Sequence, residues 1–197
     1  MEEVTVQSQK VDPFSYSHVI FDFDDTLAKL LIDWPKWKIE IAKLIQNYQT
    51  DFTLERATAL NHFVINQYIT RYGDTFRSDF IRVSAQAEKD NYHGYRIINE
   101  GMNLLEKLHR AEKDLYLLTS NCRLVIDPVL EELSITKHFK KIITTDEVDN
   151  LKPTSAPFKL IYEQGRPLSD YLMIGDSSSD SGFAKSAGID YLDVRDI

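Results

Sequence analysis

Four short apolar runs, each ending at or shortly before Asp, Thr, Ser or Lys, constrain the fold of this 197-residue chain more than any other feature. The runs lie at residues 18–23, 114–119, 141–145 and 171–175. Helical patterns between and after them lie at residues 100–112, 125–133, around 158–162 and near 180–187. Strands that alternate with helices predict an α/β fold whose core is a Rossmann-like, doubly wound parallel sheet covered on both faces.

The stretch from residue 28 to residue 95 breaks this alternation. Three helical patterns fill it, and Gly73 is expected to end the second of them. The sequence predicts no strand in this stretch. We therefore expect a core formed by residues 1–27 and 96–197, with a small all-helical cap, residues 28–95, inserted directly after the first strand.

Composition narrows the classes of partner. The formal net charge of −8 means that most of the surface repels a nucleic-acid backbone, so no nucleic acid polymer is expected as a partner. Cys122 is the only cysteine, so no internal disulfide can form. No apolar run approaches the roughly 18 residues that span a bilayer, and the first ten residues lack the apolar core of a signal peptide. We expect a protein that binds no membrane and resides in the cytoplasm.

Polar residues that could take part in catalysis or bind a ligand lie at the ends of the first two runs. Asp22 and Asp24 end the first run, and oxygen ligands from two such acids make a hard site suited to magnesium. A short acid motif alone is more often a helix cap beside a solvated carboxylate. Thr119, Ser120 and Asn121 end the second run, where hydroxyls and amides can hold phosphoryl oxygens. Taken alone, this segment is more simply a turn or a helix cap.

The later runs repeat the pattern. Lys152 lies on a loop after the third run, where a lysine is usually a solvated surface charge. Gly175 ends the fourth run, and a glycine there lets another group approach the main chain closely. Asp176 and Asp180 follow, one on each side of an expected helix start. Ligands of such sheets bind beyond the carboxyl ends of the strands. The ordered set of four elements therefore indicates a functional site that none of them establishes alone.

Together these segments resemble the motifs of the haloacid dehalogenase-like superfamily of hydrolases, over all of the chain but its N-terminal lead-in. Four segments carry the resemblance, in the family's order: Val-Ile-Phe-Asp-Phe-Asp-Asp-Thr-Leu at 19–27, Leu-Leu-Thr-Ser-Asn at 117–121, Lys152-Pro153, and Met-Ile-Gly-Asp-Ser-Ser-Ser-Asp at 173–180. The first and fourth motifs together are highly specific. The second is loose, and the third is a single lysine found by its position.

The resemblance implies a phosphatase mechanism. Asp22 would attack phosphorus and form an aspartyl-phosphate, which is nucleophilic catalysis by a carboxylate. Asp24 would protonate the leaving oxygen and then take a proton from water. The cofactor implied is Mg²⁺, held by the Asp22 carboxylate, the Asp24 carbonyl and Asp176, with Asp180 in support.

The resemblance also implies a phosphate-binding set and leaves one choice open. Lys152 would balance the negative charge, and Thr119 or Ser120 would bind a phosphoryl oxygen in the loop that also holds Asn121. The end of the apolar run favours Thr119, but the sequence leaves the register open by one residue. Asp25 departs from the family, because many relatives have glycine there.

The expected substrate is a small phosphorylated metabolite, because a helical lid that excludes water suits a small molecule. Asp24 argues against carbon–halogen chemistry, which needs no proton donor to a leaving alcohol. Three alternatives stay open: a phosphomutase, a phosphonatase with a Schiff-base lysine from the insert, and a catalytically silent binding protein of the same fold. Motif order disfavours a two-component receiver domain. Whether the protein is a monomer or a homodimer is undetermined from the sequence.

Overall fold

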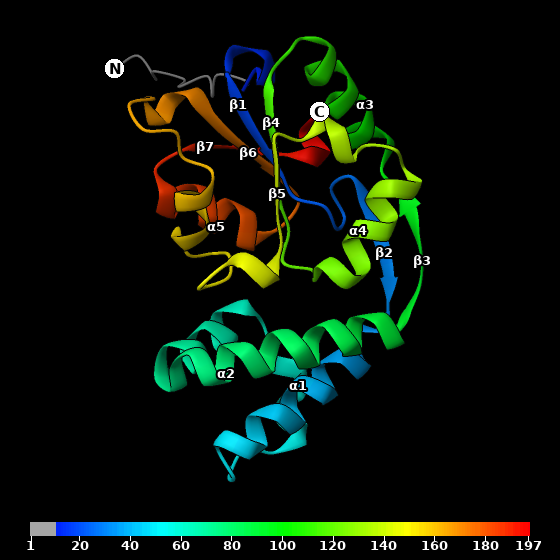
Figure 1. Cartoon of the computed structure of the whole chain (residues 1–197), viewed down its shortest axis with the longest axis vertical. Helices are drawn as coiled ribbons and strands as arrows, with labels where there is room; N and C mark the ends of the chain where they lie inside the picture. Colours follow the sequence, from blue (N-terminus) through cyan, green and yellow to red (C-terminus); the bar gives the residue numbers. More distant parts are fainter. Residues whose placement is uncertain (1–10) are drawn as a thin grey trace, which may run out of the picture.

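The computed structural model describes residues 11–197, so the first ten residues of the lead-in lie outside the described residues. Figure 1 shows an α/β part above a helical part. The sheet of the α/β part has five parallel strands in the order β5-β4-β1-β6-β7. Its strands are β1 (His18–Phe21), β4 (Asp114–Leu118), β5 (Lys141–Ile143), β6 (Tyr171–Gly175) and β7 (Asp190–Asp193). The predicted α/β fold with a parallel sheet is confirmed.

Helices cover both faces of this sheet. Val19 and Phe21 of β1 pack with α3 (Asn99–Arg110) and α4 (Arg123–Glu132). Ile20 points to the opposite face, where α5 (Ser178–Ala187) packs. A strand that is buried on both faces needs apolar side chains at every position, which explains why these runs are continuous rather than alternating.

Two elements of the core differ from the expectation. Strand β7 was not predicted, because it pairs with β6 at the edge of the sheet and only Leu192 among its residues is buried. Residues 156–160 form a short 3-10 helix in place of the α-helix expected around 158–162. Gly165 and Pro167 follow soon after, and residues of these types interrupt helices.

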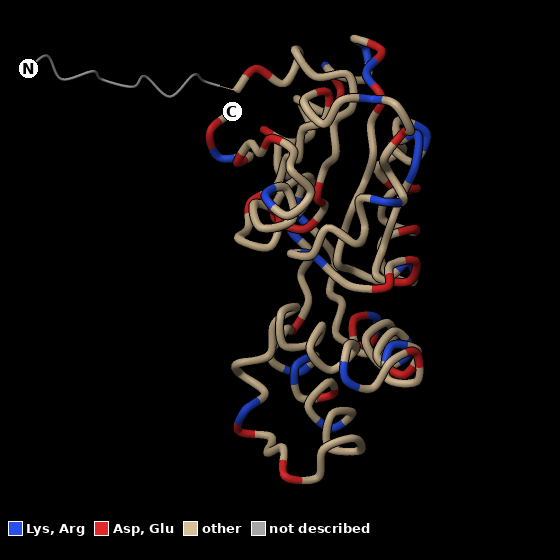
Figure 2. The backbone as a smooth tube through the Cα atoms, turned by 90° about the vertical axis from the view of Figure 1, so that its left-hand side faces the viewer, with Lys and Arg blue, Asp and Glu red and all other residues tan. Residues whose placement is uncertain are grey.

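The insert between β1 and α3 contains α1 (Trp34–Tyr48), a 3-10 helix (Leu54–Ala59) and α2 (His62–Asp90). The expectation that no strand lies within residues 28–95 is wrong. Strands β2 (Ala28–Ile32) and β3 (Tyr92–Ile97) pair antiparallel and form the two connections between the upper and lower parts in Figure 2. The burial of β2 largely alternates along the strand, because one face of the ribbon packs on the core and the other faces solvent.

Gly73 separates two helical segments, as predicted. Its φ of 66° and ψ of −152° are not helical, and they form a kink within α2, beyond which the second segment runs to Asp90. Aromatic side chains on both sides of the kink, among them Tyr68, Phe76 and Phe80, pack into the interior of the insert. Helix α2 lies across the sheet edge at which β1 and β4 end (Figure 1). No helix within residues 11–197 is long and apolar enough to cross a membrane.

Candidate active site

The chain turns back immediately after β1, and this turn places three acids at the end of the strand. The carbonyl oxygen of Phe23 accepts hydrogen bonds from the amides of Thr26, Leu27 and Ala28 at 3.2, 2.9 and 3.1 Å. Asp25 has φ 54°, in the left-handed region that glycine, asparagine and aspartate tolerate best. The aspartate at this position is therefore compatible with the turn.

Two of these acids contact fixed partners. The amide of Leu30 in β2 donates to Oδ1 of Asp24 at 2.7 Å, so the base of the insert orients that carboxyl. Burial raises the pKa of Asp24 to about 6, although the hydrogen bond from Leu30 opposes the rise. The Asp25 carboxylate lies 2.9 Å from the ammonium of Lys29. With a pKa of about 6, both the protonated and the ionised form of Asp24 are populated near neutral pH.

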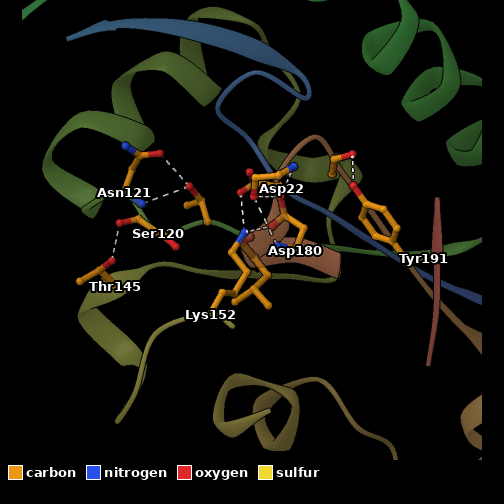
Figure 3. Close-up of polar contacts among 11 residues, drawn as sticks. Asp22, Ser120, Asn121, Thr145, Lys152, Asp180 and Tyr191 are labelled. Atoms are coloured by element: carbon orange, nitrogen blue, oxygen red, sulfur yellow. Dashed lines mark hydrogen bonds and ion pairs between the residues drawn. The ribbon is translucent and has the colours of Figure 1, made fainter. Parts of the chain in front are cut away.

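Lys152 lies at the centre of the site. Its side chain is only 2% exposed, and its ammonium donates to Oδ1 of Asp22 at 2.7 Å, to Oδ1 of Asp180 at 2.6 Å and to the Leu118 carbonyl at 2.9 Å. Figure 3 shows the lysine between the two carboxylates. Burial lowers the pKa of Lys152, but the charges of Asp180 and Asp22 outweigh burial and raise it above its ordinary value. The lysine therefore stays charged.

The other two acids are Asp176, directly after β6, and Asp180, in the first turn of α5. Asp180 is fully buried, and its Oδ2 accepts from the hydroxyl and the amide of Ser177 at 2.6 and 3.2 Å in a capping box. Gly175 makes this packing possible, because a Cβ at that position would lie 2.5 Å from Cγ of Asp180. Asp176 is half-buried, and burial together with the charge of Asp180 raises its pKa.

The acids of the site have the donor set of a divalent cation. Asp22, Asp176 and Asp180 each offer a carboxylate oxygen, and these atoms lie within 4.8 Å of one another. Burial and the charge of Asp180 raise the pKa of Asp22 even with Lys152 beside it. Three carboxyl groups thus gather around the single ammonium of Lys152. Hard carboxylate oxygens in excess of local positive charge fit a hard divalent cation.

The loop after β4 carries the expected phosphate-binding residues. Ser120 and Asn121 line the cleft, whereas Thr119 is buried and its hydroxyl donates to Oδ1 of Asn121 at 2.9 Å. The hydroxyl of Thr145 donates to the Ser120 carbonyl at 2.6 Å, as Figure 3 shows. Of the two candidate residues, Ser120 lines the cleft, although the end of the apolar run favoured Thr119. Burial raises the pKa of the neighbouring Cys122 thiol, so this cysteine is no thiolate nucleophile.

A cleft of about 330 Å³ lies between these loops and the insert. The insert lines it with aromatic, polar and charged side chains: Trp34, Trp37, Lys38, Leu60, Asn61, His62 and Glu88. Burial and the charge of Lys152 lower the pKa of His62 to about 4, so its imidazole is neutral at physiological pH. Four lysines of the insert are candidates for the Schiff base of a phosphonatase. Lys38 lines the cleft, whereas Lys29, Lys36 and Lys43 pair with nearby acids.

Sequence reasoning missed several residues of the site. Thr145 is the last residue of the third apolar run and carries the strand-end signal that marked the others, so it could have been found. His62 and Glu88 lie on the insert among many polar residues of a helix, and no motif separates them from solvated ones. Their positions in the cleft come only from the structure.

The comparisons with known proteins agree with this geometry. A family model described as haloacid dehalogenase-like hydrolase matches residues 19–194. The phosphoglycolate phosphatase of Salmonella paratyphi A is 35% identical over 107 residues, which cover 50% of this chain and 42% of that protein. The phosphoglycolate phosphatase of Pseudomonas syringae pv. tomato is 29% identical over 136 residues, covering 68% of this chain and 47% of that protein. The chain thus spans about half the length of the curated relatives that it matches.

Solved structures share the fold. A predicted phosphoglycolate phosphatase from Haemophilus somnus superposes with a TM-score of 0.58 at 19% identity, covering 90% of this chain and 84% of that chain. The HAD-type protein YfnB from Bacillus subtilis, described as bound to magnesium, superposes with a TM-score of 0.52 at 20% identity, covering 89% and 87%. At these identities the likeness shows the fold alone.

Proposed function

The chain belongs to the haloacid dehalogenase-like hydrolase family, and we propose that it is a magnesium-dependent phosphatase that hydrolyses a small phosphomonoester through an aspartyl-phosphate on Asp22. One observation carries the proposal. Oδ1 of Asp22 is held at 2.7 Å by Lys152, beside Asp176 and Asp180, at the floor of a cleft that the insert covers. A carboxylate in this setting is suited to attack phosphorus, because its neighbours can neutralise an incoming phosphoryl group.

Each residue of the site has a separate task in this reaction. Asp22 attacks phosphorus. A bond forms between phosphorus and the Asp22 carboxylate oxygen as the bond between phosphorus and the leaving oxygen breaks. Asp24 donates its proton to that oxygen, then accepts a proton from the water that attacks the aspartyl-phosphate. The water oxygen becomes part of inorganic phosphate, and the Asp22 carboxylate is regenerated. The charge of Lys152 and the donors of Ser120 and Asn121 hold the phosphoryl oxygens.

The carboxylates of Asp22, Asp176 and Asp180, together with the Asp24 carbonyl, would hold Mg²⁺. When bound, the ion supplies charge neutralisation between the anionic carboxylate and the anionic phosphoryl group. Asp180 has a second task in this site: it orients Lys152 through the 2.6 Å ion pair.

We also propose that residues 28–95 act as a cap over the core formed by residues 1–27 and 96–197. A closed cap excludes water from the reacting groups and limits the size of the leaving group. The cleft of about 330 Å³ is small, which supports a small metabolite as the substrate. Curated relatives are phosphoglycolate phosphatases, so phosphorylated carboxylic acids come first among the substrates to test.

A substrate screen tests the proposal. We expect magnesium-dependent phosphate release from at least one class among phosphorylated carboxylic acids, sugar phosphates and nucleotides. The same screen separates the alternatives, because a phosphomutase would return isomerised phosphoester and a phosphonatase would cleave a carbon–phosphorus bond. A folded protein that binds phosphoesters without turnover would refute the phosphatase and leave the silent binding protein.

A further inference from the structure

Three side chains of α2 hold main-chain atoms of the two loops that carry the phosphate-binding groups. We propose that these side chains, the α2 clasp (Asn66, Arg77 and Glu88), are positioning residues, through which the insert sets the main chain around Lys152 and around Ser120 and Asn121. The inference rests on the proposed function only for its activity measurement. The clasp would make assembly of the site depend on closure of the insert.

Asn66 binds the loop that ends in Lys152. Its amide nitrogen donates to the Leu151 carbonyl at 2.9 Å, and its amide oxygen accepts from the Leu151 amide at 2.8 Å. Asn66 is only 7% exposed. A buried side-chain amide that satisfies both polar groups of one peptide unit fixes that unit in position and orientation. The fixed residue is the one before Lys152, whose ammonium must lie between Asp22 and Asp180.

Arg77 binds the same loop nearer to β5. Its Nε donates to the Val148 carbonyl at 2.7 Å, and one terminal nitrogen donates to the Asp146 carbonyl at 3.1 Å. Asp146 in turn accepts from the amide of Arg123, the first residue of α4, at 2.9 Å. One arginine of the insert therefore holds a loop that itself contacts the start of α4.

Glu88 binds the phosphate-binding loop. Its carboxylate is 1% exposed, and Oε2 accepts from the Cys122 amide at 3.0 Å and lies 3.5 Å from the Asn121 side-chain nitrogen. Oε1 accepts from the Ser84 hydroxyl at 3.0 Å, and that hydroxyl accepts from the Trp37 indole at 3.0 Å. A buried carboxylate is costly unless its hydrogen bonds are made. Its placement against the Cys122 amide therefore ties α1 and α2 to this loop.

The three contacts lie along one helix. Arg77 and Glu88 are eleven residues apart, about three helical turns, so they lie on one face of α2 beyond the Gly73 kink. Asn66 lies before the kink and still faces the core. Arg77 and Glu88 share the helical segment after the kink, so release of one of these two contacts should loosen the other. Asn66 is linked to them across the kink by the stacked rings of Tyr68 and Phe76, whose centroids lie 5.5 Å apart.

Hydrogen exchange on the full chain tests the coupling without any substrate. Residues 119–122 contact α2 through Glu88, near the opposite end of the helix from Asn66. In Asn66→Ala we expect hydrogen exchange in these residues to rise at least tenfold. In Glu88→Ala we expect the same in residues 144–152. Gln67→Ala and Arg82→Ala are matched controls, because Gln67 is exposed and Arg82 pairs with Asp79 of its own helix. Faster exchange only in the segment that lost its own hydrogen bond would overturn the proposal.

Turnover of an aryl phosphate supplies the second readout. We expect kcat to fall at least tenfold in Asn66→Ala, Arg77→Ala and Glu88→Ala, with KM within threefold of wild type. Glu88→Gln keeps an acceptor for the Cys122 amide and should retain kcat within threefold. A uniform loss of thermal stability with kcat preserved would overturn the positioning role. If wild type turns over no phosphoester, the proposed function fails, and the exchange experiment still decides the clasp. If Glu88→Ala does not fold, the effect of Asn66→Ala on exchange in residues 119–122 decides it.

Discussion

Substitution of Glu88 by glutamine should change how the stability of the protein depends on pH. Burial raises the pKa of Glu88 to about 7 from its ordinary value of 4.5, although hydrogen bonds from Cys122 and Ser84 oppose the rise. Between these two values the folded state holds a proton that the unfolded state has lost. Stability contributed by the buried carboxyl is therefore present below pH 4.5 and is lost as pH rises toward 7.

The magnitude follows from the size of the shift. A pKa difference of about 2.5 units changes the free energy of unfolding by about 3 kcal/mol over the whole pH range. Between pH 5 and pH 8 the change is roughly 2–3 kcal/mol. Glutamine does not titrate. The free energy of unfolding of Glu88→Gln, relative to wild type, should therefore rise by roughly 2–3 kcal/mol from pH 5 to pH 8.

Urea denaturation of both proteins at half-unit pH intervals measures this difference. Contributions from Asp22, Asp24 and other titrating groups cancel, because both proteins contain them. Gln86→Ala is a suitable control, because Gln86 is an exposed, neutral residue on the same helix. A stability difference between Glu88→Gln and wild type that stays constant across this range would refute the argument from burial.

Three further predictions concern the site itself. In Gly175→Ala the new Cβ would lie 2.5 Å from Cγ of the fully buried Asp180. Overpacking of about 1–3 kcal/mol should lower Tm by about 3–10 °C and reduce activity at least tenfold. A Tm within 1 °C of wild type would contradict the packing. Mg²⁺ at about 100 times its Kd should stabilise the wild type by about 2.7 kcal/mol in thermal melts. Asp176→Asn should lose that effect and the exposed control Glu55→Gln should keep it, so equal stabilisation of both variants would exclude the site. Asp24→Asn should slow alkyl phosphates by about 10²–10⁴-fold and aryl phosphates much less, because a good leaving group needs no proton; equal losses on both would argue against Asp24 as the acid.

The arrangement of the core could be predicted from the sequence because its strands are buried on both faces. Continuous apolar runs mark β1, β4, β5 and β6, whereas β7 lies at the edge with one buried residue and leaves no such mark. The residues after the marked strands gather because parallel strands end at one edge. Asp22, Lys152 and Asp180 meet in the structure as that rule implies.

The contribution of the insert could not be predicted in the same way. Lys152 is 2% exposed, although a lysine on a loop looks like a solvated charge in the sequence. Glu88 and Asn66 look like ordinary polar residues of a surface helix, because their partners are main-chain atoms that carry no sequence signal. The ribbon of β2 and β3 was missed because β2 shows apolar residues beside a predicted helix start, and β3 is mostly polar. Contacts between residues far apart in the sequence depend on how the elements pack, and the local pattern of apolar and polar residues does not predict them.

Acid quenching during turnover tests the central claim most directly. With a substrate labelled with ³²P, the quenched wild type should carry the label on the peptide that contains Asp22, in a form that hydroxylamine removes. Asp22→Asn should carry no label and release no phosphate, while remaining folded by circular dichroism. Steady phosphate release without any label on the protein, together with full activity in Asp22→Asn, would contradict the aspartyl-phosphate mechanism.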